Sequence, residues 1–252
     1  MNKQTVIVFM PAFNEEESIG TVIENVKRDI SPFLDVKILV INDGSTDNTV
    51  QVAEEAGADY IIHLEENRGL GTAVRTGLSQ SLKLGADISV MIDADGEYPA
   101  EQISELIDPI LKGEADYVMG SRFMGTINGM QIHRRIGNYC FTLLQSVLLR
   151  RWIYDGQSGM RAFSKQVTEN AEIIHDYNYA QVLTLNIVRK GFRMKEIPIN
   201  YRVRTTGTSF IKFKDYMKNV LPAIYKEISR PVEKVTVNKN AHVTAKISPV
   251  EH

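Results

Sequence analysis

The sequence predicts an α/β protein whose central sheet is mostly parallel and covered by helices on both faces. Short apolar segments of strand type alternate with segments of helical periodicity over residues 6–92. Three of these strand segments end in acidic or polar loops. Alternating elements of this kind form parallel sheets through right-handed crossovers, and ligands then bind beyond the carboxyl ends of the strands.

Four strands and three helices are expected in this first part of the chain. The apolar runs predict strands at 6–10, 38–41, 60–62 and 88–92, and the helical segments are 14–30, 49–56 and 72–84. Ser18 is expected to cap the first helix. Gly57 and Gly85 end the other two, because glycine readily adopts the left-handed conformation found at helix ends.

The second half of the chain is less regular. It predicts an amphipathic helix at 130–153, a loop at 158–161, a helix at 178–190 and a strand at 195–203. The apolar positions of the first helix include Tyr139, Leu143, Val147 and Leu148, which we interpret as core in preference to a membrane contact. Cys140 is expected to be a small buried hydrophobe. The polar residues 231–252 predict a disordered tail.

Composition narrows the class of protein. A chain of 252 residues with 43% apolar content can bury a large core, and its net charge of −2 argues against a nucleic-acid partner. The single cysteine excludes internal disulfides and fits a reducing compartment. No signal peptide is recognisable, and no apolar run reaches the roughly 18 residues that span a bilayer. We therefore expect a cytoplasmic chain that can still contact a membrane surface.

Two aspartates follow the fourth predicted strand. Side chains alternate along an extended chain, so Asp93 and Asp95 project to the same side, and Glu97 adds a third carboxylate nearby. Adjacent carboxylates repel one another unless a cation lies between them. Oxygen ligands suit Mg²⁺ or Mn²⁺, which in turn bind phosphate oxygens. This segment therefore predicts a metal site made by Asp93, Asp95 and Glu97.

Two further loops are expected beside this site. The loop 11–16 follows the first strand and 43–45 follows the second, so both meet 93–95 at one edge of a parallel sheet. A dinucleotide fingerprint would need glycines after the first strand, and none occurs before Gly20. Gly69 and Gly71 come later, with Val74 in the third glycine position, and no Walker loop is present.

The segments P-A-F-N-E-E at 11–16, N-D-G-S-T-D at 42–47 and D-A-D at 93–95 together resemble the family-2 glycosyltransferases, which have the nucleotide-sugar-binding GT-A fold. The resemblance implies that the first loop and Asp43 hold the base and ribose of a sugar nucleotide, and that Asp95 holds the metal on its diphosphate. The implied sugar-nucleotide site comprises Pro11, Ala12, Asn14, Glu15, Asp43, Gly69, Gly71, Asp93, Ala94 and Asp95.

Four more segments narrow the resemblance. R-G-L-G-T-A at 68–73, G-S-R-F at 120–123, Q-S-G-M-R-A-F at 157–163, and I-P-I at 197–199 followed by R-T-T-G-T-S at 204–209 are similar to dolichyl-phosphate mannosyltransferases and other polyprenyl-phosphate glycosyltransferases. The resemblance implies metal-dependent, inverting transfer from a GDP- or UDP-sugar to a polyprenyl phosphate at the inner membrane face. It also implies one catalytic domain over 1–230, with a nucleotide-sugar half up to about 125 and an acceptor half after it.

A lipid phosphate calls for arginines, whose planar guanidinium groups bind phosphate oxygens in pairs. The predicted acceptor ligands are Arg122, Arg134, Arg161 and Arg204, and the predicted catalytic residues are Asp93, Asp95, Arg122, Arg161 and Arg204. Arg134 and Arg135 can instead contact anionic headgroups.

Two positions depart from the family pattern. Glu97 replaces a glutamine that is common in related enzymes, and Met160 stands where bactoprenyl glucosyltransferases often have an aspartate, with Asp155 nearby. Three other functions stay open: transfer to a glycan or wall polymer, a sugar-nucleotide-binding module without turnover that anchors a membrane-protein partner, and a nucleotidyltransferase. The last lacks its usual glycine-rich loop after the first strand.

Overall fold

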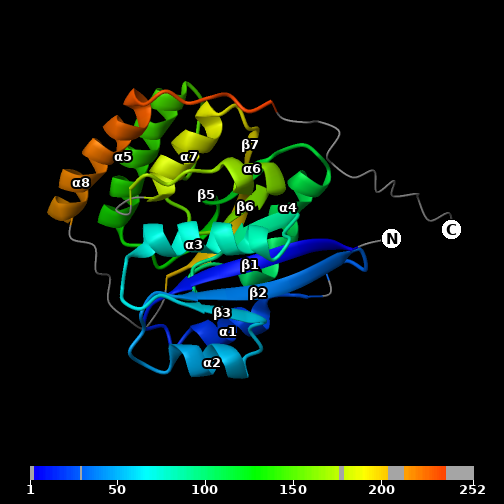
Figure 1. The fold of residues 1–252 in the computed structure, drawn as a ribbon. Coiled ribbons are helices and arrows are strands. Elements are labelled where there is room, and N and C mark those ends of the chain that lie inside the picture. The colour runs from blue at the N-terminus through cyan, green and yellow to red at the C-terminus, as the bar shows by residue number, and fades with distance from the viewer. Residues whose placement is uncertain (1–2, 29, 176–178, 204–212, 237–252) are drawn as a thin grey trace.

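The computed structural model describes residues 3–28, 30–175, 179–203 and 213–236, without the side chains of 133 and 213–219. A seven-stranded sheet runs through the molecule, with helices on both sides (Figure 1). Its strands are β1 Gln4–Ala12, β2 Leu34–Asn42, β3 Tyr60–His63, β4 Ile88–Met91, β5 Tyr117–Asn128, β6 Arg161–Ser164 and β7 Met194–Arg202.

The strand order is β3-β2-β1-β4-β6-β5-β7. β6 is antiparallel to both of its neighbours, β4 and β5, while the other pairs are parallel. The predicted mostly parallel α/β sheet is therefore confirmed. The sequence predicted a loop at 158–161, but Arg161 already belongs to the antiparallel β6, which inserts between β4 and β5 so that Met91 pairs with Arg161.

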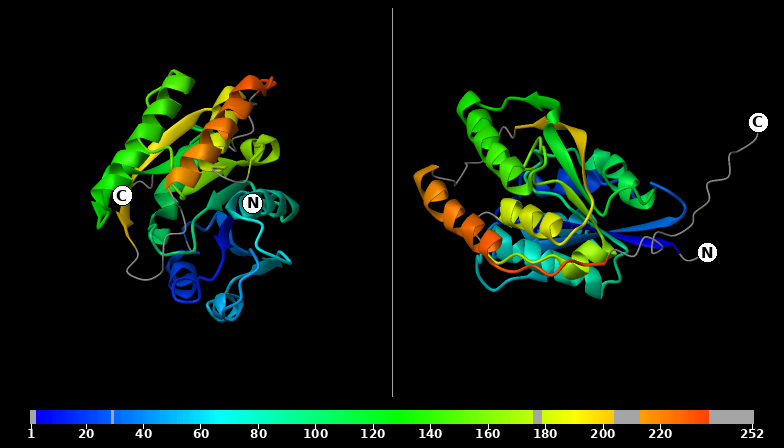
Figure 2. Two further views of the ribbon diagram at one scale, coloured as in Figure 1. Left: turned by 90° about the vertical axis from the view of Figure 1, so that its left-hand side faces the viewer. Right: turned by 90° about the horizontal axis from the view of Figure 1, so that it is seen from above.

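The helices cover both faces of the sheet. The helices are α1 Ile19–Asn25, α2 Thr49–Glu55, α3 Leu70–Lys83, α4 Ile103–Leu111 with the short 3-10 turn η1 Ala100–Gln102 before it, α5 Ile132–Leu149, α6 Lys165–Asn170, α7 Tyr179–Arg189 and α8 Phe213–Ser229. Buried residues of α1 and α4 pack on one face of the sheet, and those of α3, α6 and α7 pack on the other. α5 and α8 flank α7 at one side of the molecule (Figure 2).

Alternation along β1 builds both halves of the core. Val6 and Val8 join the cluster under α1 and α4, whereas Ile7 and Phe9 join the one under α3. Contact on the second face is close, because a Cβ at Gly77 of α3 would come within 2.3 Å of the Phe9 ring. β1 is thereby buried on both faces, as expected for a central parallel strand.

The first helix is shorter than predicted. It begins at Ile19, because residues 15–18 form turns, and the Ser18 hydroxyl does not cap it. That hydroxyl donates instead to the carbonyl oxygen of Ala94, at 2.8 Å. In the predicted tail, Val235 N donates to Lys190 O at 2.9 Å, and 237–252 lies outside the described residues.

The interpretation of α5 as a helix with a buried apolar face was wrong. Tyr139, Leu143, Val147 and Leu148 are exposed, and so is Cys140. The buried side of the helix carries Phe141 together with the polar residues Thr142, Gln145 and Ser146. Within the described part of the chain, no helix is both long and apolar enough to span a bilayer.

Candidate active site

Three loops meet at the carboxyl edge of the sheet, as the sequence predicts. Asn14 connects the first loop to the second. Its backbone N–H donates to Ser45 Oγ at 3.0 Å, and its side-chain oxygen accepts from Thr46 N at 2.8 Å. Asn14 has a φ of 55°, a left-handed conformation that asparagine tolerates. The Ser18–Ala94 hydrogen bond joins the first loop to the third.

Asp43 holds a fourth segment against this edge. Its buried carboxylate accepts hydrogen bonds from Arg68 N at 2.8 Å and Gly69 N at 2.9 Å. Burial raises the pKa of Asp43, and these two hydrogen bonds oppose the rise. Gly44 allows the close approach, since a Cβ there would lie 2.7 Å from Asn67 N. Because α3 begins at Leu70, Asp43 fixes the backbone at the start of that helix.

The predicted sugar-nucleotide residues are brought together around these contacts. Pro11 and Ala12 end β1 and pair with Ile41 and Asn42 of β2, so both are buried. Asn14 is exposed, and Glu15 N donates to Thr49 Oγ1 at 2.8 Å. Of this group, Asn14 therefore presents the most side chain to the surface.

Asp93 and Asp95 follow β4 and are both half-buried. Asp95 Oδ1 accepts a hydrogen bond from Glu97 N at 3.1 Å, which shapes the turn. Burial raises the pKa of Asp93 well above its ordinary value, and the charges of Asp95 and Glu97 add to this, while Arg161 and Arg122 oppose it. Crowded carboxylates of this kind favour a bound cation.

Glu97 differs in placement from the two aspartates. It is buried and accepts a hydrogen bond from the Tyr201 hydroxyl on β7. The ring of Tyr201 packs edge-on against that of Tyr98, with centroids 5.4 Å apart. In the described ranges, no group of three or more Asp, Glu, His or Cys side chains is arranged to hold a metal ion.

Two carboxylates still fit Mg²⁺ or Mn²⁺. Such ions are often held by one or two carboxylates together with phosphate oxygens of the substrate. The donor set of Asp93 and Asp95 is made of oxygen alone, which suits both ions. The arrangement therefore accommodates a cation whose coordination a diphosphate completes.

The segment before β6 closes the site on the other side. Gly159 lies so near Asp93 that a Cβ built on it would fall 1.8 Å from Asp93 Oδ2. Its amide N–H donates to the Tyr98 hydroxyl at 2.8 Å. Sequence reasoning missed Gly159, Tyr98 and Tyr201, although Gly159 and Tyr98 lie in or beside the motifs that it used.

Arg122 is buried in a two-point ion pair. Its Nε donates to Asp155 Oδ2 at 2.7 Å and its NH2 group to Oδ1 at 2.8 Å. The guanidinium carbon lies 5.2 Å from the centroid of the Tyr201 ring. Arg122 sits in an irregular stretch of β5 where the register with β7 shifts between Ser121 and Thr126. Because Asp155 is fully buried in this pair, it is not available as a base.

The other three predicted acceptor arginines are placed very differently. Arg161 is completely buried, and its guanidinium donates to Ser158 O at 2.7 Å, Tyr117 Oη at 2.6 Å and Ala180 O at 3.0 Å. A side chain buried in this way supports the site from inside the protein, whereas the sequence predicted a direct ligand of the acceptor phosphate. Arg134 is exposed in the first turn of α5. Arg204 lies outside the described residues.

This sheet, with an acidic pair beyond β4, defines the class of protein as a glycosyltransferase with the GT-A fold. A crystal structure of glucosyl-3-phosphoglycerate synthase from Mycobacterium tuberculosis with Mn²⁺, UDP-glucose and phosphoglyceric acid matches it with a TM-score of 0.73. The match is 21% identical and covers 90% of this chain and 81% of that one. The model of Glycosyl transferase family 2 matches residues 7–171, and the chain belongs to that family.

Two relatives are similar over most of the chain. Polyprenol monophosphomannose synthase from Mycolicibacterium smegmatis is 31% identical over 217 residues, covering 82% of this chain and 80% of the relative. UDP-N-acetylglucosamine–dolichyl-phosphate N-acetylglucosaminyltransferase from Methanococcus voltae is 32% identical over 183 residues, covering 66% and 71%. The expected resemblance to polyprenyl-phosphate glycosyltransferases is confirmed, and the chain is an enzyme of the hexosyltransferase type.

Proposed function

We propose that this enzyme transfers a hexose from a GDP- or UDP-sugar to a polyprenyl phosphate, with inversion at the sugar carbon. The observation that carries the proposal is the half-buried pair Asp93 and Asp95 at the carboxyl edge of the sheet, beside the motif that bears Arg122. The names of the two relatives above support the lipid-phosphate acceptor.

The donor side of the proposed site is the first half of the chain. The first loop, Asp43 and the start of α3 are proposed to hold the nucleotide, and Asp93 and Asp95 to hold Mg²⁺ or Mn²⁺. Such a cation stabilises the charge that develops on the leaving nucleoside diphosphate. The presence of Mn²⁺ and UDP-glucose in the structurally similar synthase supports this assignment.

The acceptor side needs no strong base. A phosphate oxygen of the lipid attacks the sugar carbon, the bond to the diphosphate breaks, and the nucleoside diphosphate leaves with the electron pair. A lipid phosphate is already anionic near neutral pH, so it needs orientation more than deprotonation. This chemistry agrees with the ion-paired Asp155 and with Met160, which is fully buried.

Arginines are proposed to orient the acceptor. Arg134 is exposed and can bind a phosphate directly. Arg122 and Arg161 supply fixed positive charge behind the site, and Arg204 remains a proposed direct ligand. We further propose that the enzyme works as a peripheral protein at the inner face of the membrane, where such a lipid phosphate is found.

A transfer assay tests the proposal. Purified enzyme, Mn²⁺ or Mg²⁺, a panel of GDP- and UDP-sugars and a polyprenyl phosphate should give a lipid-linked sugar, and Asp95→Asn should lose at least about 100-fold in rate. Asp35→Asn is the matched control, because Asp35 is a half-exposed aspartate at the amino end of β2 that pairs loosely with Lys37 at 3.6 Å. Nucleotide release without a lipid product would refute the proposed acceptor.

A further inference from the structure

Helix α5 turns its apolar side outward. Five exposed side chains, Ile132, Ile136, Tyr139, Leu143 and Val147, follow one another at steps of three or four residues and therefore lie on one helix face. We call this set the apolar stripe. Its exposed fractions reach 77% at Ile132 and 65% at Val147, which is unusual for a helix of a protein surrounded only by water.

Hydrogen bonds on the buried side hold the helix in this orientation. Ser146 Oγ accepts from Ile153 N at 3.0 Å, and Thr142 Oγ1 accepts from Gly156 N at 3.0 Å. Gln145 Nε2 donates to Gln181 O of α7 at 3.3 Å. Rolling the helix to bury the stripe would break these bonds and leave buried polar groups unpaired, which is costly.

Helix α8 extends the apolar surface. Leu221, Tyr225 and Ile228 are exposed on it at the same spacing, Tyr225 by 74%. α5 and α8 both pack on α7 through a small cluster of Phe141, Leu185, Val220 and Ile224, and they share one side of the molecule (Figure 2).

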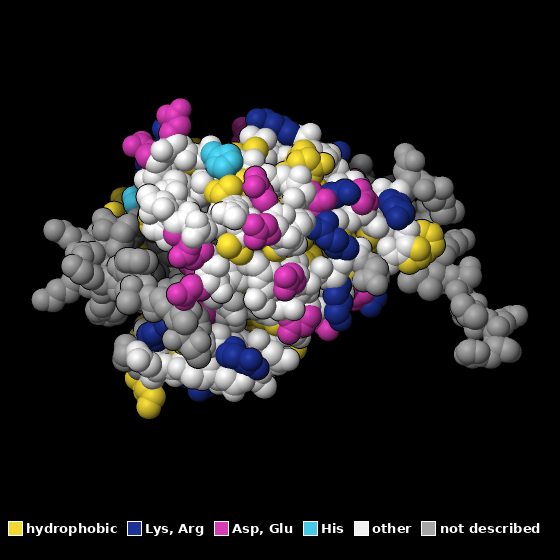
Figure 3. Space-filling view, turned by 90° about the horizontal axis from the view of Figure 1, so that it is seen from below, with side chains coloured by type: hydrophobic (Ala, Val, Ile, Leu, Met, Phe, Trp, Pro, Cys, Tyr) yellow, Lys and Arg dark blue, Asp and Glu magenta, His cyan; other side chains and the backbone are white. Residues whose placement is uncertain are grey.

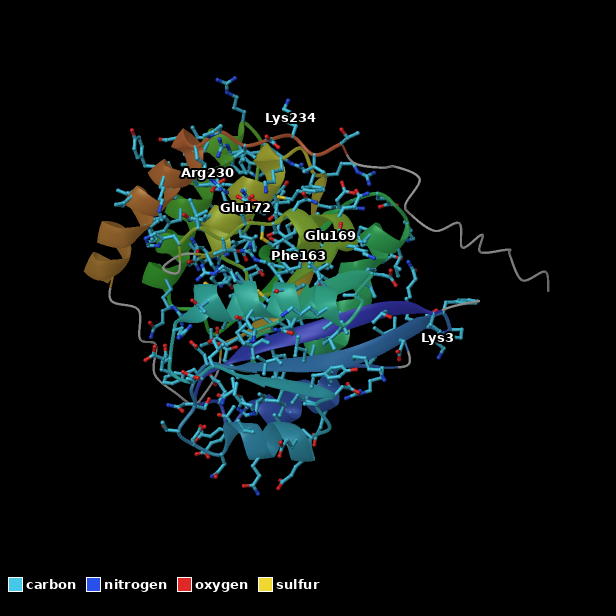
Figure 4. The ribbon with its side chains drawn as sticks, in the orientation of Figure 1. Lys3, Phe163, Glu169, Glu172, Arg230 and Lys234 are labelled. Carbon is cyan, nitrogen blue, oxygen red and sulfur yellow. The ribbon has the colours of Figure 1, made fainter. Side chains whose placement is uncertain are left out.

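Helix α8 is also held in place. Glu227 is fully buried and pairs with Arg189 at 3.2 Å and with Arg230 at 2.7 Å. Arg230 pairs in addition with Glu172, and Figure 4 shows the two close together near α7. These pairs fix the carboxyl end of α8, so its apolar residues stay at the surface.

The apolar surface lies on the same side as the proposed site. β1 starts near the N-terminus at the right of Figure 1 and runs to the left, where α5 and α8 are found. Phe123, next to Arg122, stacks on Tyr139 of the stripe with ring centroids 4.3 Å apart. By contrast, the face over α1 and α2 shows mixed charges with only scattered apolar side chains (Figure 3).

Charges at the ends of the stripe identify its partner. Arg134 and Arg135 are exposed in the first turn of α5, and Arg150 and Arg151 follow its last turn. Trp152, 66% exposed, lies beside them. Apolar residues flanked by arginine and tryptophan match the interface of an anionic bilayer. A second copy is a poor partner, because pairing two stripes about a two-fold axis brings arginines against arginines.

We propose that the face formed by the apolar stripe of α5 and by Leu221, Tyr225 and Ile228 of α8 docks on an anionic lipid bilayer. The helices lie in the plane of the interface, with apolar side chains among the acyl chains and arginines at the phosphates. This inference rests on the proposed function for one point, namely that docking serves to bring the active site to a lipid-borne phosphate. The docking itself requires no acceptor lipid.

Vesicle co-sedimentation tests the docking face. The full chain should bind vesicles of phosphatidylcholine with about 30% phosphatidylglycerol and bind pure phosphatidylcholine more weakly. Leu143→Glu combined with Val147→Glu should weaken binding at least about tenfold, because two charges would have to enter the acyl region. Phe33→Glu is the matched control, since Phe33 is exposed just before β2. Thermal unfolding verifies that all variants are folded.

Absence of wild-type binding, or equal binding by the double variant, would overturn the proposal. The proposal would also be overturned if sedimentation velocity showed that the wild type is a dimer and the double variant a monomer, because the stripe would then be a subunit interface. Binding is measured without sugar nucleotide, and transfer is measured separately with a water-soluble, short-chain prenyl phosphate. Vesicle binding without transfer refutes the proposed function alone, and transfer without vesicle binding refutes the docking face alone.

Discussion

The carboxylate of Asp93 lies against the backbone of Gly159, with no room for a methyl group between them: a Cβ there would fall 1.8 Å from Asp93 Oδ2. The two residues are brought together because β6 inserts antiparallel to β4. The position of one of the two proposed metal ligands thus depends on a glycine that is distant in the sequence.

Replacing Gly159 with alanine should displace Asp93 and lower kcat/KM by roughly 100-fold, since a shift of about 1 Å in a reacting group has an effect of that size. Steady-state rates and Mn²⁺ titration in the presence of nucleoside diphosphate measure both consequences. Gly137→Ala is the control, because nothing lies within 4 Å of a Cβ at that position in α5. Unchanged rates in Gly159→Ala would show that Asp93 tolerates displacement.

Asp155→Ala should lower the free energy of unfolding by about 3–5 kcal/mol, because it leaves the Arg122 guanidinium buried without its carboxylate. Activity should fall as well, since Arg122 is released. Chemical denaturation gives the stability change. Glu114→Ala provides the comparison: it removes an exposed pair with Lys195, and its effect should stay below about 1 kcal/mol. Equal effects of the two substitutions would contradict the stabilising role of the buried pair.

Glu97→Gln should retain cation binding. The carboxylate accepts a hydrogen bond from Tyr201, which a glutamine oxygen can also accept. We expect its effect on Mn²⁺ affinity to be at least about tenfold smaller than that of Asp95→Asn, measured by titration calorimetry with nucleoside diphosphate. A loss as large as that of Asp95→Asn would establish Glu97 as a direct ligand, as its spacing in the sequence suggests.

Glu172 should contribute to the acid sensitivity of the fold. The hydrogen bond from Lys190 lowers the pKa of Glu172, and Arg230 adds to this. A lowered pKa means that the folded state favours the charged form. Its stabilising effect is therefore complete above the ordinary pKa of about 4.5 and is lost as the pH falls through the lower folded value.

Glu172→Gln should consequently make the free energy of unfolding fall less steeply below about pH 4.5. The difference should stay under about 1 kcal/mol, because the Glu172 side chain is half exposed. Urea unfolding at several pH values measures it, with Glu65→Gln at another exposed site as the control. Parallel pH profiles for wild type and Glu172→Gln would argue against this role.

Local pattern was sufficient for the order of strands and helices over residues 6–92. Apolar runs that end in acidic loops predict parallel strands whose ends meet, and Asn14 and Ser18 do join those loops by hydrogen bonds. The reason is that a βαβ crossover leaves one arrangement of neighbouring strands. The second half was harder to predict, because β6 reverses direction and inserts between β4 and β5.

For α5, the sequence correctly indicated a helix with one apolar face. The prediction that this apolar face is the buried one was wrong. Periodicity reports that two faces differ, whereas burial depends on what packs against each of them. Here Thr142 and Ser146 find hydrogen-bond partners in the segment 153–156, so the polar face turns inward.

By itself, the sequence determined the parallel α/β class, the convergence of the acidic loops and the family, because these depend on local patterns and short motifs. Only the tertiary structure decided that Glu97 pairs with Tyr201, 104 residues away, that Arg161 is buried, and that the apolar stripe faces outward. These outcomes depend on contacts across the sheet between distant segments, which no local pattern of residues specifies.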